Sequence, residues 1–170
     1  MVLHSMRIRG LLRHFYEEAK TGEFWGLDQA EEYIMWNKEN LYSPFNFLTV
    51  TDQPHLPFED NKFCLLYGIS VFTHIEYHSD NWLMEIRRVL RPGGHAVVTA
   101  HNEDAVDYFI EHGRPSWIPE DIDLHEIKKH DVYFISGNEW YGKHIFYKTA
   151  YPRKEWGKYF EGGVSIHFTR

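Results

Sequence analysis

The stretch Leu90–Ala100, LRPGGHAVVTA, constrains the fold of this chain more than any other segment. Upstream of it, apolar residues at helical spacing over residues 79–90 predict an amphipathic helix. The RPGG sequence at 91–94 should stop that helix, because proline breaks it and glycine pairs favour turns. Residues 95–100 then predict a buried strand. A helix, a turn and an apolar strand in this order are typical of α/β proteins.

Further apolar runs predict strands near residues 24–28, 45–50 and 62–70, and helical stripes lie at 9–20 and 30–40. These strands are continuously apolar rather than alternating, which indicates burial on both faces. The 170 residues are enough for one domain with a real core. The sequence therefore predicts an α/β fold in a single domain over residues 1–170, with a mostly parallel sheet and helices on both faces.

Residues from 101 onward show poor periodicity and many aromatic side chains. We expect residues 102–160 to form a cap on the acceptor side of a site, with a helix at 152–160 and a weak strand at 163–168. Seven aromatic side chains there could line an acceptor pocket, although core and hairpin packing is the simpler interpretation: Tyr133, Trp140, Tyr141, Tyr147, Tyr151, Trp156 and Tyr159.

Charge and cysteine content exclude several classes of function. The formal net charge of −7 argues against nucleic-acid binding, which requires a basic face. Cys64 is the single cysteine, so neither an internal disulfide nor a cysteine-based zinc site can form. The apolar runs are shorter than a membrane span, and the first ten residues lack the apolar core of a signal peptide. We therefore expect a cytoplasmic protein without membrane association.

Two carboxylates follow predicted strands where a ligand would meet the sheet. Asp28 ends the run at 24–28, and a carboxylate there can accept hydrogen bonds from both hydroxyls of a ribose. Asp52, followed by Gln53, comes after the run at 45–50 and could accept a hydrogen bond from an adenine amino group. The alternatives are a helix cap for Asp28 and a turn before Pro54 for Asp52. Both alternatives remain open at this point.

Other catalytic patterns lack support in the sequence. His125 and His130 are five residues apart, whereas a helical zinc pair needs a spacing of four. No Gly-x-Ser-x-Gly elbow and no phosphate-binding Gly-Lys-Ser/Thr sequence occurs. We therefore expect no metal site, and neither a serine hydrolase nor a P-loop enzyme.

Taken in order, DQPHLPFEDNKFCLLYGISVFTHI at 52–75 and WLMEIRRVLRPGGHAVVTAH at 82–101 carry a family resemblance. The chain resembles class I S-adenosylmethionine-dependent methyltransferases of the small-molecule type. The match runs over residues 11–101 and more faintly through YPRKEWGKYF. The resemblance implies a Rossmann-like fold, S-adenosyl-L-methionine as cofactor and a small-molecule methyl acceptor.

The resemblance also implies roles for particular residues. His74 and Tyr77 are the nearest options for a general base, and the catalytic residues are otherwise unassigned. The residues that would bind the cofactor fall into three groups: Asp28 and Gln29 at the ribose, Asp52 and Gln53 at the adenine, and Tyr67, Gly68 and Ile69 beside the methionine part.

The chain departs from the family pattern at both ends. Gly10 is what remains of the glycine-rich loop, and Arg7 and Arg9 stand where glycine would let the backbone approach the cofactor. Cys64 replaces an expected aspartate, and the sequence stops before a last antiparallel strand. We therefore expect a sheet that is incomplete at both ends and lacks its first and last strands, with impaired activity.

Two other functions remain in competition with methyl transfer. The altered loop favours a non-catalytic binding or scaffolding module that kept the sheet and lost the cofactor. A nicotinamide-dependent oxidoreductase would share the ribose carboxylate at Asp28, but it does not carry the ordered LPF and LRPGG sequences. Binding of S-adenosylhomocysteine, compared with binding of NAD, separates these alternatives.

Overall fold

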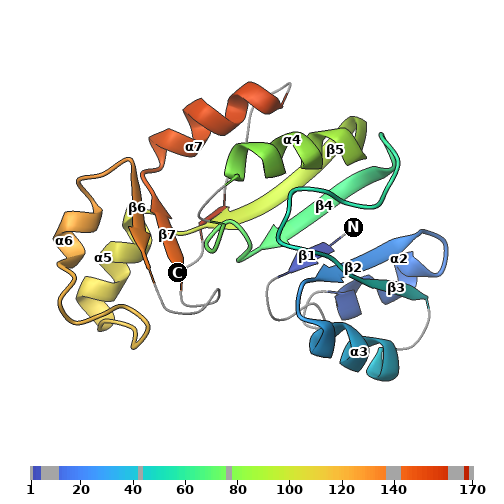
Figure 1. Ribbon diagram of the computed structural model, residues 1–170, viewed down its shortest axis with the longest axis horizontal. Coiled ribbons are helices and arrows are strands. Elements are labelled where there is room, and N and C mark those ends of the chain that lie inside the picture. The colour runs from blue at the N-terminus through green and yellow to red at the C-terminus, as the bar shows by residue number, and fades with distance from the viewer. Residues whose placement is uncertain are drawn as a thin grey trace. The chain divides into compact units, whose positions relative to one another are not determined.

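The structure is a computed structural model that describes residues 2–4, 12–41, 44–75, 78–136, 143–160 and 167–168. Figure 1 shows its helices and strands. The chain divides into two compact units, each with its own hydrophobic cluster. Unit 1 comprises Met1–Ile69 and Glu85–Val97, and unit 2 comprises Ser70–Met84 and Val98–Arg170.

Unit 1 is built on a parallel sheet. β1 pairs in parallel with β2 on one side and with β4 on the other, and β2 pairs in parallel with β3. The full strand order is β3-β2-β1-β4-β5-β8, and Figure 1 labels the first five of these strands along the chain, β1 to β5. The predicted α/β fold with a mostly parallel sheet is thereby confirmed. The strands of this unit are β1 (Val2–His4), β2 (Phe24–Asp28), β3 (Phe45–Thr49), β4 (Phe63–Ile69) and the first part of β5 (Leu90–Ala100).

The expectation that the first strand is missing is wrong. Val2–His4 occupies the centre of the sheet, with Leu3 in register with Leu27 of β2 and with Gly68 of β4. The strand has three residues, compared with seven in β4. Among the described residues, the last strand beside β5 is β8 (His167–Phe168). It is parallel to β5, whereas the last strand of the family pattern is antiparallel. A first strand is therefore present but short, and the described sheet lacks the last antiparallel strand, as expected of an incomplete sheet.

One cluster of apolar side chains holds the helices of unit 1 against the sheet. Leu12, Ile34 and Phe47 are buried together, and Tyr67 packs against them. Ile34 lies on α3 (Glu31–Asn40), which carries acidic residues in its first turn and a lysine in its last, as the helix dipole favours. The predicted stripe at 9–20 is described from residue 12 and forms two short helices, η1 (Arg13–Phe15) and α2 (Tyr16–Ala19).

α4 (Ser79–Val89) confirms the predicted amphipathic helix, since Leu83, Ile86 and the other members of its apolar stripe are buried. β5 begins at Leu90, directly after the helix. The chain still bends at 91–94 as predicted, because Gly93 has a φ of 75°, the value that a turn with proline at the preceding position uses. A Cβ at Gly94 would lie 3.1 Å from the carbonyl oxygen of Phe63, at the start of β4. Gly94 thus lets its own backbone lie close to the start of β4.

Unit 2 contains regular elements that the sequence analysis missed. The sequence after residue 101 shows poor periodicity, yet α5 (Glu103–His112) buries Ala105, Val106 and Phe109 on one face. The side chain of Asn102 caps this helix, accepting a hydrogen bond from the Ala105 N–H at 3.2 Å. The other elements of unit 2 are α6 (Leu124–Ile127), the antiparallel pair β6 (Val132–Ile135) and β7 (His144–Tyr147), α7 (Ala150–Glu155) and η3 (Trp156–Tyr159).

The helix predicted at 152–160 is confirmed by α7 and η3, and β8 falls within the weak strand predicted at 163–168. Among the residues that the structure describes, no helix is long and apolar enough to cross a membrane.

A proline at Leu3 tests the central place of β1. Because proline lacks an N–H, Leu3→Pro removes a ladder hydrogen bond inside the sheet and should lower the free energy of unfolding by about 1–3 kcal/mol. Leu3→Val keeps the N–H and serves as the control. Urea unfolding measures both variants, and a proline variant as stable as the valine variant would show that residues 2–4 are not part of the sheet.

Candidate functional site

The carboxyl ends of four parallel strands meet at one edge of unit 1. Asp28, the last residue of β2, is in register with Thr49, the last residue of β3. His4, at the end of β1, is in register with Ile69, at the end of β4. Ligands of open parallel sheets bind beyond this edge. The edge is therefore the candidate site.

Asp28 is the most informative side chain at this edge. It is 2% exposed. Its Oδ1 accepts a hydrogen bond from the Ala30 N–H at 2.9 Å, while its Oδ2 is buried and has no partner among the described residues. A buried carboxylate oxygen without a donor is costly and usually has a reason. The oxygen fits a hydroxyl group of a bound ligand.

Burial sets the charge state of Asp28. It raises the pKa of the carboxyl group, against the lowering effect of hydrogen bonds from the backbone of Ala30 and Gln29, and the pKa reaches about 6. Gln29 itself is exposed and follows the strand directly. The cap contact to Ala30 and the ligand role can coexist in Asp28, because they use different oxygens.

Asp52 and Gln53 lie on the loop that follows β3. The loop begins beside Asp28, since the Val50 N–H donates to the Asp28 carbonyl at 3.0 Å. Both side chains are exposed, and the Gln53 amide nitrogen donates to Asp52 Oδ1 at 3.2 Å. Their place on the loop agrees with the predicted adenine role, which stays a prediction.

A half-buried arginine holds the next part of the same loop. Arg88 of α4 donates to the carbonyl oxygens of Phe58 at 2.7 Å and Leu56 at 2.9 Å. It also contacts Glu85, with its Nε 2.8 Å from Oε2 and its Nη2 2.7 Å from Oε1. Glu85 Oε1 in turn accepts the Leu56 N–H at 2.6 Å. The LPF segment is therefore fixed by one ion pair.

Tyr67, Gly68 and Ile69 form the end of β4. The Tyr67 ring packs inward, with its centroid 5.6 Å from that of Phe15, and Gly68 is buried. The Tyr67 ring therefore belongs to the core. Its role beside the methionine part of the cofactor stays a prediction.

Several other candidates lie outside the described residues or outside any site. Arg7, Arg9 and Gly10 of the altered loop are among the undescribed residues, as are Tyr77, Trp140 and Tyr141. No group of His, Cys, Asp or Glu side chains in the described part of the chain is arranged to hold a metal ion. His130 Nε2 instead lies 3.2 Å from Glu126 Oε1.

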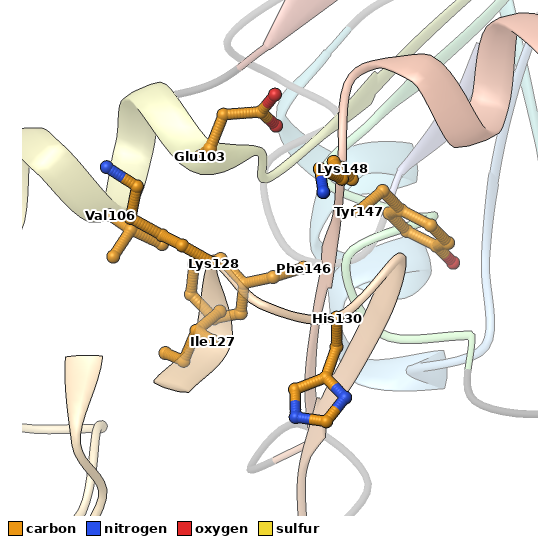
Figure 2. Close-up of a pocket in the computed structure, with 8 residues that line it drawn as sticks. All are labelled: Glu103, Val106, Ile127, Lys128, His130, Phe146, Tyr147 and Lys148. Carbon is orange, nitrogen blue, oxygen red and sulfur yellow. The ribbon is translucent and has the colours of Figure 1, made fainter. Parts of the chain in front are cut away.

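Core packing accounts for two of the aromatic candidates in unit 2. Tyr147 and Trp156 are buried, with ring centroids 5.0 Å apart. Figure 2 shows a pocket beside Tyr147. Its volume of about 10 Å³ holds about one water molecule, which is too small for a methyl acceptor. The pocket is lined by Glu103, Val106, Ile127, Lys128, His130, Phe146, Tyr147 and Lys148.

Unit 2 also brings together three histidines whose clustering the sequence did not reveal. The ring of His144 lies 4.9 Å from that of His74 and 6.3 Å from that of His101, between centroids. Trp117 stacks on His144 at 3.8 Å. The three histidines lie 27 or more positions apart in the chain, so no local spacing indicates that they cluster.

Comparisons with known proteins agree with this geometry. A family model described as a methyltransferase domain matches residues 9–98. The ubiquinone/menaquinone biosynthesis C-methyltransferase UbiE of Cupriavidus pinatubonensis is 27% identical over 141 residues, covering 79% of this chain and 49% of the relative. The chain thus spans about half the length of that curated relative.

Two solved structures show the same fold. A protein from Pyrococcus horikoshii matches with a TM-score of 0.56 and 20% identity, covering 88% of this chain and 67% of that one. A SAM-dependent methyltransferase from Methanosarcina mazei matches with a TM-score of 0.54 and 17% identity, covering 86% and 71%.

Proposed function

The chain belongs to the methyltransferase-domain family, whose cofactor is S-adenosylmethionine, and from this premise we propose that it transfers a methyl group to a small-molecule acceptor. The observation that carries the proposal is the orphaned Oδ2 of Asp28 at the carboxyl edge of the sheet. A ribose hydroxyl supplies the donor that this oxygen lacks.

Different residues at the edge contact different parts of the cofactor. Asp28 accepts the two ribose hydroxyls, Asp52 and Gln53 contact the adenine, and the backbone at Gly68 and Ile69 lines the methionine part. When bound, the cofactor supplies an activated methyl group on a sulfonium. The protein then contributes orientation and exclusion of water, which are the main requirements of an in-line displacement.

The name of the UbiE relative refers to ubiquinone and menaquinone biosynthesis. Hydroquinones are therefore the first acceptors to test. The competing proposal of a non-catalytic binding module rests on Arg7 and Arg9, which stand where glycine is expected. This module would give no methylated product with any acceptor.

S-adenosylhomocysteine should stabilise the protein and NAD should not. A ligand at 100 times its Kd adds about 2.7 kcal/mol to the free energy of unfolding, and each kcal/mol raises the Tm of a chain of this size by about 2–4 °C. A thermal-shift titration with both compounds measures the difference. Stabilisation by NAD alone would replace the methyltransferase proposal with the oxidoreductase.

The affinity tests the expectation about the glycine-poor loop. Two arginines in the segment that approaches the cofactor should weaken binding, and each 1.4 kcal/mol lost is a tenfold increase in Kd. Calorimetry with S-adenosylhomocysteine measures this Kd directly. Micromolar binding by the chain as it stands would show that residues 5–11 still form a working loop.

A further inference from the structure

Lys62 lies among three aromatic rings of unit 1. Its Nζ is 5.9 Å from the ring centroid of Trp25, 5.6 Å from that of Phe58 and 6.0 Å from that of Phe63. Trp25 is the second residue of β2, Phe58 belongs to the loop after β3, and Phe63 is the first residue of β4. We call these three rings the aromatic group. One ammonium ion is thus shared by rings from three segments of the chain.

The aromatic group is held together by its own contacts. The centroids of Trp25 and Phe58 are 5.1 Å apart with an interplanar angle of 68°, and those of Phe58 and Phe63 are 4.9 Å apart at 88°. Edge-to-face pairs of this kind are the arrangement that aromatic quadrupoles favour. Phe63 is 5% exposed, while Trp25 and Phe58 are half-buried. Because the rings stand at steep angles to one another, they border Lys62 Nζ on different sides.

A carboxylate fixes one direction at the Lys62 nitrogen. Glu23 Oε1 lies 3.2 Å from Lys62 Nζ, and the same oxygen accepts a hydrogen bond from Trp25 Nε1 at 2.7 Å. The hydrogen bonds from Trp25 and Lys62 lower the pKa of Glu23. The carboxylate therefore stays ionised at neutral pH and accepts one N–H of the ammonium, which leaves the other two positions on nitrogen for the rings.

The distances to the rings suit a methylated nitrogen better than an unmodified one. An N–C bond of about 1.5 Å pointing at a ring would place a methyl carbon about 4.1–4.5 Å from the centroid. This is close to the usual contact distance of about 3.5–4.0 Å between carbon atoms. An N–H bond is shorter and leaves a gap. Groups of aromatic rings around a cation are the typical binding site of methylated ammonium ions.

We propose that Lys62 Nζ is a methylation site, which carries two methyl groups against the aromatic group and donates its remaining N–H to Glu23. The methyl donor is a sulfonium compound. The ammonium first loses a proton to water, and the nitrogen lone pair then forms the bond to the methyl carbon. The electron pair of the broken carbon–sulfur bond returns to sulfur. A second round gives a dimethylammonium ion, which keeps its positive charge and one N–H.

The site is separate from the candidate cofactor site of the same unit. Phe63 begins β4 and Ile69 ends it at the cofactor edge, and seven residues of strand extend roughly 20 Å. This distance exceeds the length of a lysine side chain, so a donor bound at that edge cannot reach Lys62 of its own chain. The methyl groups come from another enzyme molecule. The inference therefore does not depend on the proposed function.

Reductive methylation tests the fit without any enzyme. Carbon-13 formaldehyde with a borane reductant converts accessible lysines of the folded protein to dimethyllysine, and the side chain of Lys62 is 31% exposed. Carbon–proton NMR then reports the ring currents at each pair of methyl groups. The Lys62 signal, identified by its loss in Lys62→Arg, should lie further upfield than any other. A Lys62 signal at the position of exposed dimethyllysines would overturn the proposal.

Lys20 is the matched comparison, because its Nζ lies over a single ring, that of Tyr16, at 5.0 Å. Its signal, identified with Lys20→Arg, should be displaced less than that of Lys62. Phe58→Leu removes one ring of the aromatic group and should move the Lys62 signal toward the exposed position, with the Lys20 signal unchanged. An unchanged Lys62 signal in Phe58→Leu would overturn the proposal. The wild-type spectrum decides the fit even if this variant does not fold.

Mass spectrometry of the protein isolated from the cells that make it tests whether the site is used. Dimethyllysine is expected at position 62, and unmodified lysine at position 20 serves as the internal comparison. Unmodified lysine at position 62 would overturn the methylation site. Trimethyllysine there would overturn the role given to Glu23, because a trimethylated nitrogen has no N–H to donate.

Discussion

Replacing Arg88 with methionine should lower the free energy of unfolding by about 3–5 kcal/mol, the cost of leaving a buried carboxylate without its ion-pair partner. The side chain of Glu85 is 9% exposed and that of Arg88 is 29% exposed. Without Arg88, the Glu85 carboxylate stays buried, and two backbone carbonyls of the LPF segment lose their donors. The contact to the exposed Asp60 adds little.

Arg87→Met is the matched control, since Arg87 is an exposed arginine one position earlier on the same helix. It should change the free energy of unfolding by less than about 0.5 kcal/mol, as most surface substitutions do. Urea unfolding with an unchanged m-value measures both variants. A loss below about 1 kcal/mol for Arg88→Met would mean that the ion pair does not hold the loop.

The pH dependence gives a second check on the ion pair. Burial favours a high pKa for Glu85, but hydrogen bonds from Arg88 and Leu56 and the charge of Arg88 outweigh it and lower the pKa. The resulting stability is present above the pKa of an unfolded glutamate and is lost as the pH falls through the lowered value. The difference between wild type and Arg88→Met should therefore shrink in acid.

Asp28→Asn should stabilise the free protein and weaken cofactor binding. The raised pKa of about 6 means that the folded state resists ionisation of Asp28. The stability from this group is full below the unfolded pKa near 4 and is lost as the pH rises through about 6. The neutral variant avoids that loss, so its free energy of unfolding at neutral pH should exceed that of the wild type by up to about 3 kcal/mol.

Binding should change in the opposite direction. The asparagine side chain is uncharged, so it cannot replace the charged acceptor that binds both ribose hydroxyls. The loss should weaken the binding free energy by about 1.5–3 kcal/mol, or roughly 10- to 150-fold in Kd. For the wild type, the affinity should rise as the pH increases through about 6, where Asp28 ionises. Calorimetry with S-adenosylhomocysteine across this range measures both effects.

Asp52→Asn is the comparison for this prediction. Asp52 is exposed, so the variant should not gain stability, and it should lose less affinity because it gives up one contact instead of two. If Asp28→Asn binds S-adenosylhomocysteine as tightly as the wild type, Asp28 is not the ribose ligand. The assignment of the edge as the cofactor site would then be wrong.

The strands that could be predicted are those with a long enough apolar run. β2, with the sequence FWGLD, was predicted with its observed bounds, and β3 and β4 were predicted to within two residues at their ends. β1 has three residues, too few to show any period, and its central place depends on pairing with β2 and β4. α5 was missed because polar and aromatic residues dilute its stripe, although Asn102 is a recognisable cap.

The candidate site shows the same division between local and long-range information. The position of Asp28 at the end of a strand follows from local sequence, and the structure confirms that position. Its orphaned oxygen depends on how the surrounding chain packs, and no pattern encodes it. The contacts of Arg88 with Leu56 and Phe58 join positions 30 or more residues apart. The pairing of His74 with Lys143 spans 69 residues.

The central place of β1 affects how the chain is synthesised. Val2–His4 leave the ribosome before both of their neighbours in the sheet, β2 and β4, and β4 ends only at Ile69. Until β4 emerges, β1, β2 and β3 can pair with one another, but β1 lacks its second neighbour. The nascent three-stranded sheet therefore exposes an unpaired edge at β1. This domain should therefore depend on chaperones most strongly until residues 63–69 have been translated.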